Sequence, residues 1–466
     1  MSARSRSTSR STGRRRAGLA LALLPALAGC ADRYAEEGFR EAAQVAAPAA
    51  GSTAVWIRSP DDEREVRDKI ASILAKPLAA DEAVQIALMN NRGLQASFAE
   101  LGIKAADLAE MSLPPSPGAS FKRLAGGGSV DIERQLGIDV IGLLARPILY
   151  DIERQRFERQ KLRAARSILA VAAATRNAYF GAVAAAQSAD YAGQVVEAAE
   201  ARLDLAKRMK DAGNWSALDY AREQVFHGET LAGALRAKLA AGVARERLVR
   251  QMGLSGAELK FGLAARMPDL PAAPGEERDI EAKAVADRLD IKAAKAETES
   301  LASSLGLTRV TRLVDVLEAS YVRETGGGSR DGYEVRLEVP LFDFGAAKVA
   351  RAENTYMQAV HRLAETAANA QSEAREAYGR YRASYDLARR YRDDVVPARK
   401  TVSEELTLRY SGMLVSVFEL LTDARDQIAT VTAAIEAQRD FWIADTDLRF
   451  VTLIDGAAAD SDRSAR

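Results

Sequence analysis

The residues best placed to do chemistry are two acids at equivalent positions about 200 residues apart. Asp219 follows Ser216 by three residues, and Glu419 follows Ser416 by the same interval. Ser-x-x-Asp/Glu is typical of a helix start, where the acid closes the first turn as part of a capping box. A second use of such an acid is to attract cations, which a carboxylate in a cap can still do where it stays exposed.

A second candidate site is Cys30, the only cysteine in the chain. It ends the sequence LAGC (27–30), which follows an arginine-rich start and a short apolar stretch at 19–27. This pattern is typical of a bacterial lipoprotein signal peptide, and the apolar stretch is too short to remain as a membrane helix. We predict cleavage after residue 29 and acyl chains, palmitate among them, on Cys30. The alternative is an ordinary signal peptide with a chance cysteine.

No arrangement of residues for catalysis is found in the sequence. The two histidines, His227 and His361, have no cysteine partner at a metal-ligand spacing. The glycine triplets are not followed by Lys-Ser or Lys-Thr, so they form no phosphate-binding loop. The 65 basic and 65 acidic residues balance, which gives no case for nucleic-acid binding. We predict that the protein is not an enzyme and carries no cofactor and no metal.

The two acids lie in a unit that occurs twice along the chain. The matching pairs are NRGLQA (91–96) with RLDIKA (288–293), PILYD (147–151) with PLFD (340–343), and SALD (216–219) with SVFE (416–419). A repeat of this kind decides the architecture before any single element does. The predicted segments are a signal peptide at 1–29, an extended lipid-anchored segment at 30–80, repeats at 81–267 and 268–455, and a disordered tail at 456–466.

Each repeat is predicted to contain a helix, a strand pair, a long helix and a further helix, which makes the fold mainly α with a small β part. The strands are expected at about 117–149 and 307–342. The long helices are expected at about 151–211 and 346–410, and each ends at a glycine-containing turn.

The strand that is clearest in the sequence follows Gly332. Tyr333, Val335 and Leu337 alternate there with charged residues, which is the period of a β-strand. Such a strand fits a solvated antiparallel sheet, and it fits a transmembrane barrel with a wet lumen equally well. Beyond Cys30 we expect no apolar stretch long enough for a transmembrane helix, so a membrane crossing would use β-strands.

The last helix of each repeat carries an apolar seam. The seams are Leu421, Ala424, Ile428, Val431 and Ile435 in the second repeat, and Val225, Leu231, Leu235 and Leu239 in the first, with the small residues Gly228 and Ala232 between. Spacings of three and four residues predict coiled-coil packing. The seams fit the core of an ordinary helical bundle, or a wall of helices around a tunnel.

In this order of elements the chain resembles the TolC-type outer-membrane factor family, over about residues 78–454. AVQIALMNN (83–91) is similar to the family's opening helix, and VPLFDFG (339–345) to its strand-to-helix signature. The segment 410–425 is similar to the periplasmic tip of the family. With the lipoprotein signal, the resemblance points to the lipid-anchored branch.

The resemblance implies a homotrimer in which a 12-stranded β-barrel in the outer membrane continues as a long α-helical barrel in the periplasm. It implies a passive conduit of a tripartite efflux or type I secretion system. A periplasmic adaptor protein and an inner-membrane pump would be its partners. The alternative is a lipid-anchored periplasmic coiled-coil scaffold that does not form a pore.

The resemblance also implies roles for residues of the tip. Tyr410 and Asp219 match positions that help to hold the tip shut, and Glu419 matches an acidic position of the aperture. The latch arginine of some members is replaced by Val415 in this chain. We therefore expect an apolar closure through Val415 and Phe418, with Val417 as a further candidate.

Overall fold

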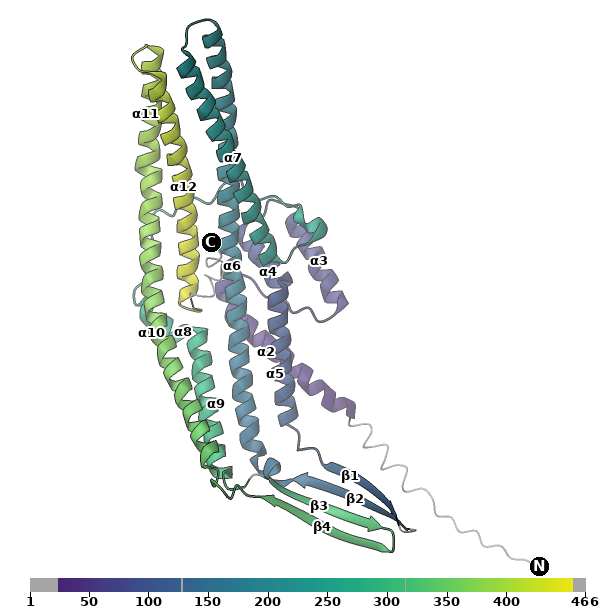
Figure 1. Cartoon of the computed structure of the whole chain (residues 1–466). Helices are drawn as coiled ribbons and strands as arrows, with labels where there is room; N and C mark the ends of the chain where they lie inside the picture. Colours follow the sequence, from purple (N-terminus) through teal and green to yellow (C-terminus); the bar gives the residue numbers. More distant parts are fainter. Residues whose placement is uncertain (1–23, 127–128, 315, 456–466) are drawn as a thin grey trace, which may run out of the picture. The chain divides into compact units, whose positions relative to one another are not determined.

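The computed structural model describes residues 24–126, 129–314 and 316–455 (Figure 1). The chain is mostly helical and has one four-stranded sheet, as predicted. It divides into two compact units: Met1–Ala42, Phe98–Ala164 and Lys292–Ala364 form unit 1, and Ala43–Ser97, Ala165–Ile291 and Glu365–Arg466 form unit 2. Most of the predicted signal peptide and the predicted tail at 456–466 lie outside the described residues.

One order of elements occurs twice: a helix pair, a strand pair, a long helix and a further helix. The first set is α4 (Ala80–Asn90), α5 (Arg92–Met111), β1 (Gly118–Gly126), β2 (Ser129–Asp139), α6 (Val140–Asp211) and α7 (Ala217–Met252). The second set is α8 (Ile280–Asp287), α9 (Leu289–Thr311), β3 (Val316–Thr325), β4 (Ser329–Glu338), α10 (Ala346–Arg390), α11 (Val396–Ser411) and α12 (Val417–Val451). The short 3-10 helix η1 (Gly256–Leu259) follows the first set.

The long helix of the second repeat is divided, whereas a single helix at 346–410 was expected. A π-helical segment, η2 (Tyr391–Val395), separates α10 from α11. Pro397 follows in the first turn of α11, where it cannot donate a backbone hydrogen bond. A π-helical turn next to a proline is a recognised cause of local irregularity in a long helix. The first repeat has no such break, because α6 is continuous.

The prediction of an extended segment at 30–80 is wrong. Two helices, α2 (Leu24–Ala50) and α3 (Pro60–Leu74), occupy most of this segment. Buried alanines recur along α2 at helical spacing and permit close packing: Ala35, Ala42, Ala46 and Ala50. Pro60 lies at the start of α3, where its fixed φ is favourable and its missing N–H is not needed.

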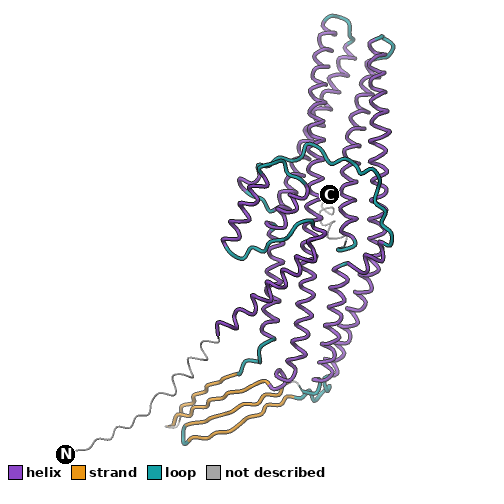
Figure 2. The backbone as a smooth tube through the Cα atoms, turned by 180° about the vertical axis from the view of Figure 1, so that it is seen from behind, coloured by secondary structure: helices purple, strands orange, loops and turns teal. Residues whose placement is uncertain are grey.

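The four strands form one antiparallel sheet in the order β1-β2-β3-β4, and both hairpin turns lie at the end of the sheet away from α6 and α9 (Figure 2). The strands are shorter than predicted, because α6 and α9 extend into the two predicted ranges. Asp139 ends β2 and accepts a hydrogen bond from the N–H of Gly142 at 2.9 Å, which begins α6. Pro147, expected in a strand, therefore lies inside a helix.

The strand register gives the sheet two different faces. On the polar face, the side-chain amide of Gln135 donates to Ser320 Oγ at 2.7 Å and to Glu334 Oε2 at 3.1 Å. On the other face, called the apolar face below, apolar side chains of three strands gather toward the helices: Leu136, Ile138, Leu317, Ala319, Tyr321, Tyr333, Val335 and Leu337. The large side chains on this face of β4 are exposed, as with Tyr333 at 88%. Within the described residues, Val335 and Leu337 on this face of β4 are likewise exposed, at 60% and 57%.

Among the described helices, α6 alone contains an 18-residue stretch long and apolar enough to cross a membrane. We expected no such stretch beyond Cys30, but by length and composition α6 contains one. However, 56% of the stretch is buried, as in the core helix of a water-soluble protein. The stretch therefore does not by itself indicate a membrane span.

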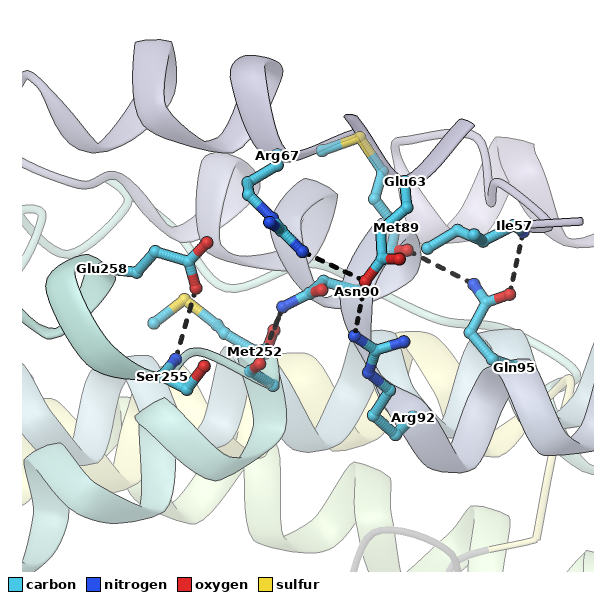
Figure 3. Close-up of polar contacts among 11 residues, drawn as sticks. Ile57, Glu63, Arg67, Met89, Asn90, Arg92, Gln95, Met252, Ser255 and Glu258 are labelled. Atoms are coloured by element: carbon cyan, nitrogen blue, oxygen red, sulfur yellow. Dashed lines mark hydrogen bonds and ion pairs between the residues drawn. The ribbon is translucent and has the colours of Figure 1, made fainter. Parts of the chain in front are cut away.

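The motif that opens each repeat lies at a matching helix junction in unit 2. Between α4 and α5, Asn90 donates from Nδ2 to the carbonyl oxygens of Met252 and Gly253, at 3.1 and 2.8 Å (Figure 3). Between α8 and α9, the backbone N–H of Leu289 donates to the carbonyl of Leu453 at 2.8 Å. The opening helices of each repeat thus contact the end of that repeat's last helix.

The core of unit 2 is rich in aromatic rings. Trp442 stacks on Phe180 with ring centroids 5.5 Å apart, and Phe441 lies edge-on to Trp442 at 5.1 Å. Arg288 is only 1% exposed, and its guanidinium contacts Asp290 at 2.7 Å and Glu373 at 2.6 Å. Because a buried charge is tolerated only when paired, this group joins the second repeat's helix junction firmly to α10.

Candidate functional site

The five predicted tip residues lie around two helix turns at the same end of unit 2. One turn joins α6 to α7 and the other joins α11 to α12, and the turns are neighbours in both views (Figures 1 and 2). Asp219 and Glu419 lie in the first turns of α7 and α12. Tyr410 lies in the last turn of α11, and Val415 and Phe418 lie on either side of the start of α12. The structure therefore brings the predicted residues together.

Both turns have the same backbone geometry. In the first, Gly213 has φ +76°, and the N–H of Asn214 donates to the carbonyl of Met209 at 2.9 Å. In the second, Met413 has φ +60°, and the N–H of Leu414 donates to the carbonyl of Arg409 at 2.9 Å. This is the Schellman motif, which favours glycine at its left-handed position. The second turn has methionine there, so it is strained relative to the first.

Each of the two acids lies beside the serine that caps the helix after its turn. Ser216 Oγ accepts from the N–H of Asp219 at 3.1 Å and lies 2.6 Å from Asp219 Oδ2. The N–H of Ser416 donates to Glu419 Oε2 at 3.2 Å, and the N–H of Glu419 donates to Ser416 Oγ at 3.4 Å, a reciprocal capping box. The capping-box interpretation is therefore confirmed for Glu419, whereas at Asp219 the Ser216 hydroxyl alone caps the helix and the carboxylate contacts that hydroxyl. Glu419 remains exposed and Asp219 half-exposed, so capping does not hide either carboxylate from solvent.

An arginine that the sequence analysis did not single out connects the two turns. Arg222 lies 3.4 Å from Asp219 Oδ1, within the same helix turn. Its guanidinium also lies over the ring of Phe418, 5.4 Å from the centroid. Asp219 thus holds the cation that contacts the aromatic side chain of the other turn. The spacing of three residues after Asp219 is the one sequence signal that points to Arg222.

Apolar side chains are unusually exposed around the second turn. Met413 is 94% exposed and Leu414 is 78% exposed, and Phe418 retains 54% exposure beside Arg222. Val417 differs, because it packs on a buried cluster formed by Ala199, Phe226 and Leu421. The closure through Phe418 stays a prediction, whereas Val417 contributes to packing between α7 and α12.

No protein-family model and no curated protein sequence matches the chain. Solved structures do match it. The CmeC outer membrane channel of Campylobacter jejuni has a TM-score of 0.69 and 17% identity, over 82% of this chain and 86% of that one. CusC has a TM-score of 0.65 and 15% identity, over 80% and 92%. The open state of the MtrE outer membrane channel of Neisseria gonorrhoeae has a TM-score of 0.60 and 17% identity, over 80% and 88%.

The chain has the TolC-type outer-membrane channel fold. The resemblance inferred from sequence is thereby confirmed for the fold. In this outer-membrane channel fold, the turns that hold Asp219 and Glu419 correspond to each other as parts of the two repeats, with a serine N-cap in each and the same hydrogen-bonded turn.

One helix turn beyond each of these acids, the channel fold buries a second acid. Glu223 is 2% exposed and accepts from Arg202 at 3.0 Å. Asp423 is 7% exposed, accepts from Ser403 Oγ at 2.7 Å and lies 3.5 Å from Arg399. Each pair joins the two helices of one hairpin. Asp423 faces α11, so it does not take the place of a carboxylate at an aperture.

These buried acids were not expected as site residues, because the sequence does not tell whether an acid in the first turns of a helix faces solvent or the neighbouring helix. The sequence does contain one signal for them: in both repeats a second acid, Glu223 or Asp423, follows four residues after Asp219 or Glu419.

The other predicted site, Cys30, lies in α2, and its side chain is outside the described part of the structure. Its acylation stays a prediction. Within the described residues, no group of three or more His, Cys, Asp or Glu side chains is arranged to hold a metal ion. His227 lies 3.9 Å from Glu200 and is half-buried between helices.

Proposed function

We propose that this protein is the outer-membrane channel of a tripartite efflux or type I secretion system, and that three copies form one passive conduit. The observation that carries the proposal is the fold shared with outer-membrane channels. A sheet whose two faces differ and whose two edges are open supports it. The protein would lie in the outer membrane, extend into the periplasm and be anchored by acyl chains on Cys30.

The strand lengths suit a bilayer. β1 to β4 contain 9, 11, 10 and 10 residues, the length of a tilted strand that crosses a membrane. The apolar face would meet lipid, and the face with Gln135, Ser320 and Glu334 would meet the lumen. An open strand edge is not tolerated in hydrocarbon, so β1 and β4 need partners from other copies. Three copies supply the twelve strands of a closed barrel.

The helices leave a second surface that needs a partner. On α7, exposed apolar residues form a stripe: Val225, Leu231, Leu235, Leu239 and Val243. The matching seam on α12 is mostly covered within the chain, as with Leu421 at 2% exposure and Ile435 at 6%. An exposed stripe of this length marks an interaction surface. A neighbouring copy in the trimer would cover it as part of the helical barrel.

The tip is where the conduit would open. Asp219, Arg222 and Phe418 link the two turns, and Glu419 would form a ring of three carboxylates under threefold symmetry. A periplasmic adaptor and an inner-membrane pump would displace the Arg222–Phe418 contact and supply the energy. The resemblance to the family suggests both partners.

The test is conductance in planar bilayers, measured with the acylated protein purified as trimers. Discrete ion-conducting steps are expected, with preference for cations. A Glu419→Gln variant should keep the steps and lose part of the cation preference. A stable trimer without conductance would favour the periplasmic scaffold, and so would a lone copy that does not enter lipid.

A further inference from the structure

Three arginines lie on the apolar face of the sheet, at the end near the hairpin turns. Arg123 of β1, Arg134 of β2 and Arg323 of β3 share this face because of the strand register. Arg134 is paired with Arg323, and Arg123 is paired with Ile132, two residues before Arg134. Each of the three is exposed. Three basic groups therefore stand close together where alternation alone would place apolar side chains.

Arg134 and Arg323 lie in one row with Phe121, and Arg123 lies in the next row toward the turn with Ile132. The row next to Arg134, toward the helices, contains Leu136, Tyr321 and Tyr333. Tyrosines with an apolar ring and a polar tip are typical of the boundary between lipid and water. A guanidinium is costly in hydrocarbon but tolerated at this boundary. The rows thus pass from apolar to aromatic to a mixture of basic and apolar side chains, as the surroundings would pass from acyl chains to headgroups.

The charge of this cluster is not balanced within the chain. Arg323 pairs with Asp331 at 3.4 Å, but among the described residues Arg123 and Arg134 have no acidic partner. On the polar face, by contrast, Lys122 pairs with Glu133 at 3.5 Å and Arg336 pairs with Glu318 at 3.3 Å. Three arginines and one aspartate leave two positive charges on this face, where all three arginines are exposed.

We propose that Arg123, Arg134 and Arg323 bind the phosphate groups of anionic lipid in the leaflet that surrounds the hairpin turns. The proposal rests on the proposed function, because it needs the sheet to lie in a membrane. Arginine suits this ligand, since its planar fork donates two hydrogen bonds to one phosphate. With the helices in the periplasm, the hairpin turns face outward, so the ligand is a phosphorylated lipid of the outer leaflet. The trimer has three such sites.

The test measures binding of bis-phosphorylated lipid A to the purified acylated trimer in neutral detergent. The comparison ligand is the same lipid without its phosphates. The triple variant Arg123→Gln, Arg134→Gln, Arg323→Gln should weaken binding of the phosphorylated lipid about a hundredfold, since each basic group near a membrane surface contributes about fivefold. Asp331→Asn should strengthen binding, because it removes the one acid of the cluster.

The matched control removes three basic groups from the polar face, Lys122→Gln, Arg330→Gln and Arg336→Gln. It has the same change in net charge and should alter lipid affinity less than threefold. Inorganic phosphate at matched ionic strength should not displace the lipid. Equal loss in the two triple variants, or displacement by inorganic phosphate, would overturn the proposal. Conductance distinguishes failure of the lipid site from failure of the proposed channel function. If the protein forms channels but does not prefer phosphorylated lipid, the lipid site alone is refuted. If the protein does not insert into the bilayer, the proposed function is refuted as well.

Discussion

The guanidinium of Arg222 lies 5.4 Å from the centroid of the Phe418 ring and joins the tips of the two repeats. The two repeats do not form this contact in both directions. The position of Arg222 is occupied by Thr422 in the second repeat, and the position of Phe418 is occupied by Leu218 in the first. Thr422 and Leu218 cannot make a cation–π contact. Threefold assembly would place three such contacts around the aperture. In the proposed channel, this pair takes the part that a latch arginine would have at Val415.

Removing the cation should favour the open tip. A cation–π contact at an exposed site contributes about 0.5–1 kcal/mol. Arg222→Gln should therefore raise the open-to-closed ratio about two- to fivefold for each contact, seen as longer or larger conductance steps. Arg222→Lys should fall between the two, because lysine keeps the charge but stacks less well. Lys238→Gln, farther along α7, is the control; equal effects of Lys238→Gln and Arg222→Gln would argue against a latch.

The second turn should become more stable when its left-handed residue is glycine. Met413 has φ +60°, which costs about 1 kcal/mol for a residue with a Cβ. Met413→Gly should slow amide hydrogen exchange at the end of α11, and Gly213→Ala should speed exchange at the end of α6. The two variants act on equivalent turns in opposite directions. Faster exchange in Met413→Gly would mean that contacts of the methionine outweigh backbone strain.

Gly345 should be intolerant of any side chain. It has φ +76°, and a Cβ there would lie 2.3 Å from the carbonyl oxygen of Arg312, a contact with backbone that cannot swing away. Gly345→Ala should sharply reduce the yield of folded protein in membranes. Gly306→Ala is the matched control within α9, where an added Cβ meets nothing within 4 Å and alanine favours the helix. Normal yield of Gly345→Ala would show that the turn after β4 is not built as described.

The start of α10 should lose stability in acid. Hydrogen bonds from the N–H groups of Gly345 and Ala347 lower the pKa of Asp343, which lies outside the strands. The folded pKa is below the unfolded value of about 3.9, so the stabilisation is complete above that value and is lost as the pH falls through the folded pKa.

The thermal midpoint of Asp343→Ala should therefore lie below that of the wild type by a constant amount from pH 7 to pH 5. The difference should shrink below about pH 4. Asp343→Asn keeps an acceptor for the cap but cannot titrate, so its midpoint should differ from that of Asp343→Ala by the same amount at every pH, while the wild type approaches both in acid. A difference that is unchanged at low pH would contradict a charged cap.

Local chemistry explains which features the sequence could predict. The caps of Ser216 and Ser416, the glycine turn and the alternation in β4 depend on neighbours a few residues away. The helix in α2 was missed, because alanine packing there depends on tertiary burial. Pro147 was predicted to lie in a strand. The helix α6 in fact begins before it, after the Asp139 cap, and an aspartate alone is not a strong sequence signal for a helix start. The contact of Arg222 with Phe418 needs two turns that lie about 200 residues apart in sequence.

The central claim is that β1 of one copy pairs with β4 of the next, so that three copies close a barrel. Acylation would leave no free thiol, so introduced cysteines report on this edge alone. Ser120→Cys on β1 can be combined with a cysteine replacing Arg330, Gly332, Glu334 or Arg336 on the same face of β4. After oxidation in membranes, the account predicts that one register gives a covalent ladder ending at three copies. Only single copies in every register, or a ladder that continues past three, would contradict it.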